Sequence, residues 1–279
     1  MSGKLVVVGT PIGNLSDFSP RAAEALSSAD FIAAEDTRVT RKLLTHFDIH
    51  RPLVSYHEHN KRERGETLCD RMAAGEVCAL VSDAGMPAIS DPGELLVEQC
   101  VGRGIPVSVV PGPSAAVSAL VVSGLPTGRF TFEGFLSVNK KSRRAHLESL
   151  KGEKRTMIFY EAPHKLAATL SDLLEAFGDR RIALARELTK IHEEVVRTTL
   201  AQAARLYAEN EAKGEFVLVV EGAPEPAPQV VPARDAVALA REYLSQGVSA
   251  AQAARRAAAE TGRKKNELYR ELVDGRKTR

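Results

Sequence analysis

The 279-residue sequence predicts an α/β protein: two successive α/β domains followed by a small helical bundle. Three observations lead to this prediction. Short runs of Val, Ile and Leu alternate with amphipathic segments over most of the chain, prolines cluster within residues 223–233, and an Ala-rich stretch follows them. Strands that are apolar on nearly every residue, with helices between them, indicate a mostly parallel sheet covered on both faces.

The first predicted domain, residues 1–123, shows this alternation most regularly. Ser19 followed by Pro20 is typical of an N-cap and the first residue of a helix. We expect helices near 20–29, 39–47, 61–74 and 94–103 and from 114 onward, and strands at 4–9, 31–36, 53–56, 77–83 and 107–110.

The second predicted domain, residues 124–222, begins at a turn-rich stretch containing Gly124 and Gly128. We expect helices near 142–151, 164–177 and 199–211, and strands at 130–136, 156–161, 181–187 and 214–221. Residues 223–233 hold four of the 14 prolines, which favours an extended, semi-rigid linker.

The third unit, residues 234–279, has the periodicity of short helices, and Gly247 and Gly262 divide it into three. This layout is typical of a small helix-turn-helix-like bundle. It carries 11 Lys and Arg against 6 Asp and Glu, a formal charge of +5, so residues 1–233 carry −3 and the whole chain +2. The small total and the 44% hydrophobic content exclude a disordered chain and a uniformly cationic wrapper of nucleic acid.

The longest apolar runs fall far short of the roughly 20 residues that span a bilayer, and no signal peptide is recognisable. We therefore expect a cytoplasmic protein without a membrane partner. Cys69, Cys78 and Cys100 are odd in number and lack CxxC spacing, so we expect reduced packing residues.

Three loops follow predicted strands of the first domain, at residues 9–14, 82–93 and 110–116. Ligands of parallel sheets bind at the carboxyl ends of the strands, so these loops are candidate binding loops. The first lacks the Lys of a P-loop and the spacing of a dinucleotide fingerprint, so it predicts only a tight turn. The alternative for all three is a structural role, as a turn or a rigid crossover.

Several strings resemble the tetrapyrrole methylase superfamily, and within it the branch that methylates 16S ribosomal RNA. They are VGTPIGNL (8–15), AEDTR (34–38), SYHEHN (55–60), the 82–93 loop, VPGPS (110–114), FYEAPH (159–164) and RELTK (186–190). The resemblance covers nearly the whole chain.

The resemblance implies two α/β domains with a cleft between them, S-adenosyl-L-methionine as methyl donor, and a homodimer. It implies that the substrate is the ribose 2′-hydroxyl of a cytidine in the decoding region of 16S rRNA, reached in naked RNA or in the small ribosomal subunit. It also implies donor contacts at Pro11, Ile12, Asp83, Gly85, Met86, Ser114, Ala115, Tyr160, Ala185 and Glu187.

Methyl transfer to a ribose hydroxyl needs alignment of oxygen, methyl and sulfur, and it gains from a base or a cation beside the developing alkoxide. Among the ionisable residues of the motifs we expect Glu161 or Glu35 as the base and Lys190 or Arg38 as the cation. The alternative for each is that it orients a loop or pairs with a neighbour. His57 and His59 lack a third ligand, so no metal site is expected.

Two basic stretches are candidate RNA contacts, although charge runs are more often solvated faces. They comprise Lys140, Lys141, Arg143 and Arg144 in the second domain, and Arg255, Arg256, Arg263, Lys264, Lys265 and Arg270 in the tail. Two rival functions stay open: methylation of a corrin or porphyrin intermediate, for which a basic tail has no obvious use, and a non-catalytic RNA-binding assembly factor.

Overall fold

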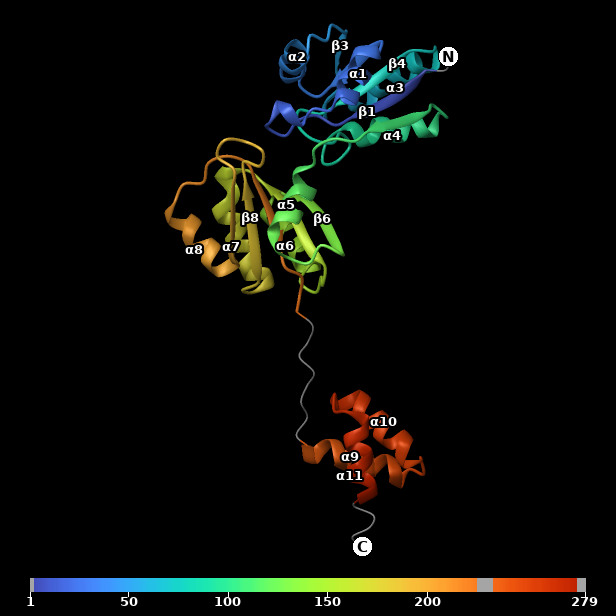
Figure 1. The fold of residues 1–279 in the computed structure, drawn as a ribbon, viewed down its shortest axis with the longest axis vertical. Helices are drawn as coiled ribbons and strands as arrows, with labels where there is room; N and C mark the ends of the chain where they lie inside the picture. The colour runs from blue at the N-terminus through green and yellow to red at the C-terminus, as the bar shows by residue number, and fades with distance from the viewer. Residues whose placement is uncertain (1–2, 225–232, 275–279) are drawn as a thin grey trace. The chain divides into compact units, whose positions relative to one another are not determined.

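The computed structural model describes residues 3–224 and 233–274, and the chain divides into two compact units between residues 223 and 224 (Figure 1). Residues 225–232, which hold most of the predicted linker, lie outside the described part of the chain. The predicted domain boundaries stay predictions, and each unit is described by itself.

The first sheet contains five parallel strands in the order β3-β2-β4-β1-β5. The strands are β1 (Lys4–Val8), β2 (Phe31–Ala34), β3 (Leu53–Ser55), β4 (Val77–Val81) and β5 (Val107–Val110). The helices that connect them are α1 (Pro20–Ser28), α2 (Thr37–His46), α3 (Lys61–Ala73) and α4 (Gly93–Gly102). The predicted parallel α/β fold is confirmed.

Alternate residues of these strands build two cores, because successive side chains point to opposite faces. Leu5 and Phe31 pack with residues of α3 and α4 on one face, whereas Val6 and Ile32 pack with residues of α1 and α2 on the other. The three cysteines are buried free thiols of the first of these cores, as predicted. The side chain of Ser19 accepts a 3.1 Å hydrogen bond from the Ala22 N–H and so caps α1.

The second sheet is mixed, in the order β6-β7-β10-β8-β9, with β6 parallel to β7 and all other pairs antiparallel. Its strands are β6 (Phe130–Phe135), β7 (Thr156–Glu161), β8 (Arg181–Arg186), β9 (Glu194–Thr199) and β10 (Phe216–Val220). The edge strand β9 has no counterpart among the predicted strands. Its side chains are only half-buried or exposed, so its hydrophobic signal is weak.

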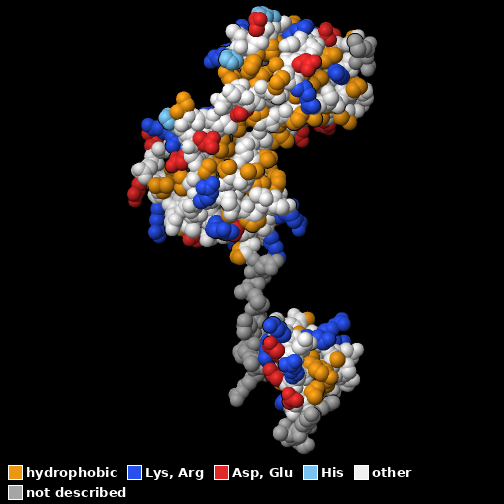
Figure 2. Space-filling view, viewed as in Figure 1, with side chains coloured by type: hydrophobic (Ala, Val, Ile, Leu, Met, Phe, Trp, Pro, Cys, Tyr) orange, Lys and Arg blue, Asp and Glu red, His pale blue; other side chains and the backbone are white. Residues whose placement is uncertain are grey.

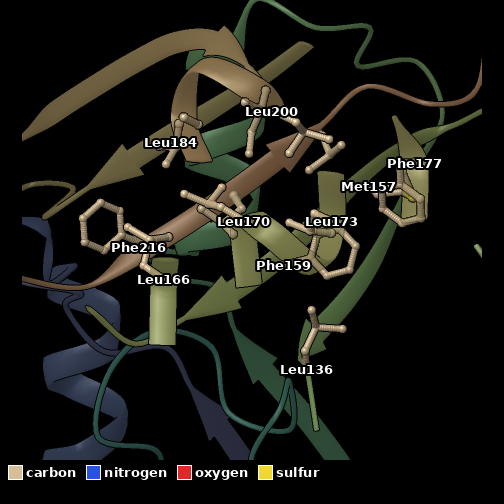
Figure 3. Close-up of a cluster of buried hydrophobic side chains, with 14 of the residues drawn as sticks. Leu136, Met157, Phe159, Leu166, Leu170, Leu173, Phe177, Leu184, Leu200 and Phe216 are labelled. Atoms are coloured by element: carbon tan, nitrogen blue, oxygen red, sulfur yellow. The ribbon is translucent and has the colours of Figure 1, made fainter. Parts of the chain in front are cut away.

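Helices α6 (Lys140–Ser149), α7 (Leu166–Phe177) and α8 (Leu200–Glu209) lie on one face of this sheet. Figure 3 shows the core beneath them, where Leu170 and Leu173 of α7 pack with Phe159 and Leu184 of the sheet. Helix α5 (Ala115–Ser123) covers the other face, where Ala119 and Leu120 join the core. Thus α5 precedes the predicted boundary at residue 123 but packs on the sheet that follows it.

The C-terminal unit contains α9 (Ala233–Ser245), α10 (Ala250–Thr261) and α11 (Lys265–Asp274) around a small Ala- and Leu-rich core. Gly247 and Gly262 lie between these helices with φ of 87° and 71°, values that favour glycine, so the predicted punctuation is confirmed. A capping box between Ser249 and Gln252 starts α10. Among the described helices, none is long and apolar enough to cross a membrane.

Candidate active site

The three loops that follow β1, β4 and β5 meet at the carboxyl edge of the first sheet. The Thr10 N–H donates to the Gly85 carbonyl at 2.9 Å and the Gly85 N–H returns a 3.2 Å bond to the Thr10 carbonyl. A Cβ atom on Gly9 would lie 2.7 Å from the Cα atom of Gly112. Glycine at both positions is therefore needed for this close approach of the first and third loops.

A cavity of about 570 Å³ opens beside these loops and is lined by residues of both sheets. This volume lies within the range of small-molecule sites. Eight of the ten expected donor contacts line it: Ile12, Asp83, Gly85, Met86, Ser114, Ala115, Tyr160 and Ala185. Pro11 and Glu187 do not line it.

One wall of the cavity carries the carboxylates of Glu35, Asp83 and Asp91. Burial raises the pKa of Glu35, and the nearby carboxylates of Asp83 and Asp91 raise it further. Asp91 accepts hydrogen bonds of 2.8 and 2.7 Å from the N–H groups of Ala88 and Gly93, and so holds the long loop in place. Burial also raises the pKa of Asp91. This acidic wall suits a ligand with positive charge.

Ala88 and Ser90 in this long loop have φ of 68° and 62°, and Glu187 and Thr189 in the loop after β8 have φ of 51° and 67°. Non-glycine residues rarely adopt such a conformation, and it is found preferentially at functional sites. Both loops contribute residues to the cavity. Four of the five non-glycine residues with positive φ in the described part of the first unit therefore lie in loops of the candidate site, and Asp48 after α2 is the exception.

Three of the four expected catalytic residues, Glu35, Glu161 and Lys190, line the cavity. The fourth, Arg38, does not. Its side chain is 87% exposed and forms a 2.7 Å ion pair with Asp36 at the start of α2. The hydrogen bonds from Arg38 lower the pKa of Asp36 to about 2. Arg38 therefore pairs with Asp36. This is the alternative role, pairing with a neighbour, that the sequence left open for each expected catalytic residue.

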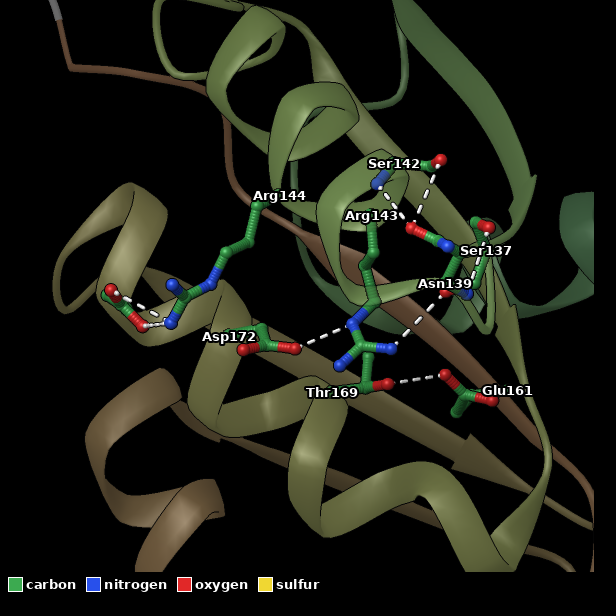
Figure 4. A network of polar contacts seen from close by, with 9 residues as sticks. Ser137, Asn139, Ser142, Arg143, Arg144, Glu161, Thr169 and Asp172 are labelled. Carbon is green, nitrogen blue, oxygen red and sulfur yellow. Dashed lines mark hydrogen bonds and ion pairs between the residues drawn. The ribbon is translucent and has the colours of Figure 1, made fainter.

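The side chain of Glu161 lies at the end of β7, and the residue is only 5% exposed. One carboxylate oxygen accepts a 2.9 Å hydrogen bond from the Ala162 N–H. The other accepts a 2.6 Å bond from the Thr169 hydroxyl (Figure 4). Both oxygens are thus engaged in holding the turn after β7 against α7. This geometry favours a loop-orienting role for Glu161 over that of a base.

Lys190 forms ion pairs of 2.9 Å with Glu187 and 3.0 Å with Glu215. Burial alone would lower the pKa of Lys190, but hydrogen bonds to both carboxylates raise it above its ordinary value. A Cβ on Gly13 would lie 2.5 Å from the Lys190 Cγ, so the glycine of the first loop leaves room for this side chain. The charged ammonium is therefore held at the cavity by Glu187, directly after β8, and Glu215, directly before β10.

Tyr160 of β7 is tied to the start of α5, because its hydroxyl accepts a 3.2 Å hydrogen bond from the Ala116 N–H. Its ring packs edge-on against Phe132 and Phe135, with ring centroids 5.0 and 5.4 Å away. Phe135 and Glu215 line the cavity but are absent from the expected set. Glu215 is 25 residues from its partner Lys190, so no local spacing points to it.

The basic residues of α6 divide into two kinds. Arg143 is mostly buried, pairs with Asp172 of α7 at 2.6 Å and donates to the Ser137 carbonyl, and Arg144 pairs with Glu175 at 3.1 Å (Figure 4). Lys140 and Lys141 are exposed at the first turn of the helix. Arg143 is thus held against α7, whereas the two lysines and Arg144, whose side chain is 53% exposed, are presented to solvent.

In the tail, Arg263 pairs with Glu271 at 2.9 Å and with Glu267 at 3.7 Å. The guanidinium of Arg256 lies 5.7 Å from the ring centroid of Tyr243. The remaining expected RNA contacts of the tail, Arg255, Lys264, Lys265 and Arg270, are exposed. The structure thus leaves them open to solvent while Arg263 is held by acids of its own unit.

The rings of His57 and His59 lie 5.9 Å apart. Within residues 3–224 and 233–274, no group of three or more His, Cys, Asp or Glu side chains is arranged to hold a metal ion.

The fold and the cavity define a class of protein. A model of the family described as Tetrapyrrole (Corrin/Porphyrin) Methylases matches residues 4–204, more than half of the chain, and the chain belongs to this family.

Individual relatives narrow the comparison. The chain is 49% identical over 270 residues to ribosomal RNA small subunit methyltransferase I of Halalkalibacterium halodurans, covering 96% of this chain and 93% of that protein. The protein of the same name from Thermotoga maritima is 48% identical, and that match covers 79% of this chain and 99% of the relative. About a fifth of this chain therefore has no counterpart in the Thermotoga protein.

A solved structure shares the fold. It is uroporphyrin-III C-methyltransferase from Thermus thermophilus complexed with S-adenosyl homocysteine, at 21% identity and a TM-score of 0.56, covering 78% of this chain and 97% of that one.

Proposed function

We propose that this protein transfers a methyl group from S-adenosyl-L-methionine to the ribose 2′-hydroxyl of a cytidine in the decoding region of 16S rRNA. The observation that carries this proposal is the 49% identity to a ribosomal RNA small subunit methyltransferase I over nearly the full length of both chains. An RNA substrate of this kind places the activity in the cytoplasm.

The cavity residues fit the proposed donor. Ile12, Ala185 and Val217 supply a buried apolar floor for an adenosine group, and the carboxylates of Glu35 and Asp83 face the same cavity. S-adenosylmethionine supplies a methyl group on a cationic sulfonium, and an acidic wall stabilises a cation in such a site. The solved relative whose title names bound S-adenosyl homocysteine supports the same ligand.

We assign the base to Glu35 and the cation to Lys190. Glu35 lines the cavity, and its pKa is raised by burial and by Asp83 and Asp91, which makes its carboxylate a stronger proton acceptor. Both oxygens of Glu161 are already occupied by protein donors. Lys190 remains charged through Glu187 and Glu215 and can stabilise a developing alkoxide.

The C-terminal unit is proposed to dock the RNA. Arg263 pairs with Glu267 and Glu271, which lie on one side of α11 and are neutralised there. Lys265, Tyr269 and Arg270 of the same helix are exposed. Cationic side chains beside an aromatic ring are the usual elements of an RNA-contacting surface.

The proposed homodimer would use an apolar face of the first unit. The exposed valines Val101 of α4, Val107 and Val109 of β5, and Val117 and Val121 of α5 lie on neighbouring elements of the chain. In addition, β5 is an edge strand of the first sheet. Exposed edge strands and clustered apolar side chains are typical of surfaces covered by a partner. Hydrophobic side chains gather on the visible face of this unit (Figure 2).

The test is methylation by the purified protein with labelled donor, using small subunits from cells that lack it, naked 16S rRNA, and uroporphyrinogen as parallel substrates. We expect label in RNA and, by mass spectrometry, one ribose methyl that is absent from RNA of the deletion cells. Label in uroporphyrinogen alone would identify a tetrapyrrole enzyme. RNA binding without donor binding in calorimetry would identify an assembly factor.

A further inference from the structure

Strand β6 contains a bulge beside the cavity. Phe132 pairs with Ile158 of β7, Gly134 with Phe159 and Phe135 with Tyr160, and the register shifts between Phe132 and Gly134. Gly134 has φ of 63°. In a regular strand, residues three apart point to opposite faces. The extra residue therefore turns Phe135 to the same face as Phe132 and Tyr160, which is how a bulge re-aims a side chain.

The ring of Phe135 is packed on one side and exposed to solvent on the other. It packs against Tyr160 at 5.4 Å and 60°, and Tyr160 is itself fixed by Phe132 and the Ala116 N–H. Phe135 nevertheless remains 59% exposed while lining the cavity. An exposed aromatic ring held in one orientation offers a stacking surface.

Burial distinguishes the mouth of the cavity from its floor. Ile12, Ala185 and Val217 are buried, whereas Phe135 and Ile89 of the long loop are 59% and 51% exposed. The buried group supplies the apolar floor assigned above to the donor. The two exposed apolar side chains lie where a second, larger substrate would enter.

Positively charged side chains follow Phe135 closely in the sequence. Arg143, paired with Asp172, donates to the Ser137 carbonyl, and Asn139 caps α6, so the segment after Phe135 is fixed (Figure 4). Lys140 and Lys141 emerge exposed from this segment. Proteins that bind unpaired nucleotides combine an aromatic side chain for the base with nearby cations for the phosphates.

We propose that Phe135 stacks on the base of the target nucleotide as that nucleotide enters the cavity out of its own stack. Enzymes that act within an RNA strand expose the target nucleotide in this way, and stacking compensates for the contacts that the base has lost. The inference rests on the proposed function, and it assigns the base recognition step to a residue of the second sheet.

Phe135→Ala, Phe135→Leu and Phe135→Tyr variants of the full chain test it, with Phe130→Ala as the matched control. Phe130 is also exposed, at 42%, and lies on the same strand, but it does not line the cavity. The measurements are the dissociation constant of S-adenosylmethionine by calorimetry and the methylation rate on limiting small subunits at saturating donor.

We expect Phe135→Ala to lower the methylation rate roughly 5- to 100-fold, the usual effect of removing one stacking ring. The Phe135→Leu variant should recover little of the lost methylation rate, because leucine is apolar but not planar. The Phe135→Tyr variant should methylate at close to the wild-type rate. Donor affinity should be unchanged in all four variants. Wild-type rates in Phe135→Ala, equal losses in Phe130→Ala, or a loss of donor affinity would each overturn the proposal. A wild-type protein without activity on RNA would instead refute the proposed function itself.

Discussion

The hydroxyl of Thr169 on α7 donates a 2.6 Å hydrogen bond to the buried carboxylate of Glu161 at the end of β7. This bond connects the cavity wall to the helix that also holds Arg143 through Asp172. Glu161 therefore fixes the turn after β7 against α7. Within the FYEAPH motif (159–164), this residue has a structural role.

Glu161→Gln should lower stability more than it lowers catalysis. The amide can accept from Thr169 but then presents its NH2 group to the Ala162 N–H, which leaves a buried donor unpaired at a cost of about 1–3 kcal/mol. Urea unfolding measures the loss, with Thr169→Val as a companion that removes the other partner. An unchanged unfolding midpoint combined with a rate loss above a hundredfold would restore Glu161 as the base.

Glu35→Gln should lower the methylation rate at saturating donor by roughly 10²- to 10⁴-fold, the usual range for a lost general base. In the wild-type protein the rate should fall as the pH drops through the raised pKa of Glu35, because the protonated carboxyl cannot accept a proton. The Gln variant should lose this limb of the pH–rate profile. If the rate of the Glu35→Gln variant still falls at low pH, the group that titrates is not Glu35.

The same substitution should not destabilise the fold at neutral pH. A carboxyl whose pKa is raised on folding binds its proton more tightly in the folded state, so stability falls as the pH rises from its unfolded pKa through its folded pKa. Gln removes that loss. We expect the unfolding free energy of Glu35→Gln at pH 7 to equal or exceed that of wild type in urea titrations, and a clear decrease would contradict the assignment.

Lys190→Ala should lower the rate by about 100- to 1,000-fold if its ammonium stabilises the alkoxide. The substitution also leaves the carboxylates of Glu187 and Glu215 without their common cation. Lys190→Arg keeps the charge and should retain more activity than Ala. Lys213→Ala, an exposed lysine of the neighbouring turn, is the control. Equal rates for Ala and wild type at saturating donor would remove Lys190 from catalysis.

Deleting residues 234–279 should leave donor affinity intact and reduce activity on small subunits. The tail carries a formal charge of +5, so its contribution should weaken as salt rises. In the full chain, Lys264→Ala combined with Lys265→Ala should reproduce part of the effect, whereas Lys151→Ala with Lys154→Ala should not. Unchanged activity after the deletion would refute the docking role.

If the apolar face forms the proposed homodimer interface, a single charged substitution in it should weaken the dimer. Val109→Lys on the exposed edge strand β5 should shift the mass measured by light scattering toward the monomer, because a buried lysine is costly at an interface. Val39→Lys on α2, which is also exposed (40% against 55% for Val109) but lies on another element, is the control. A wild-type protein that is monomeric at micromolar concentration would exclude the dimer.

The elements that sequence predicts well are those with local signals. Ser19 before Pro20 marks the start of α1, Gly247 and Gly262 separate the tail helices, and uninterrupted apolar runs identify the parallel strands. The half-exposed strand β9 carries no such signal, and it is missing from the predicted set. The packing of α5 on the second sheet is equally invisible, because its nearly all-apolar sequence suits either sheet.

The sequence by itself determined the α/β class and the candidate binding loops, because apolar periodicity, caps and loop motifs are properties of neighbouring residues. The expected donor contacts came instead from the resemblance to the tetrapyrrole methylase superfamily, and eight of the ten line the cavity. Only the tertiary structure decided what individual side chains do. Glu161 is engaged by Thr169, Lys190 by Glu215, and Phe135 is turned toward Tyr160 and the cavity by a bulge against β7. Each of these outcomes depends on a partner brought close by the fold, and no local spacing in the chain encodes it.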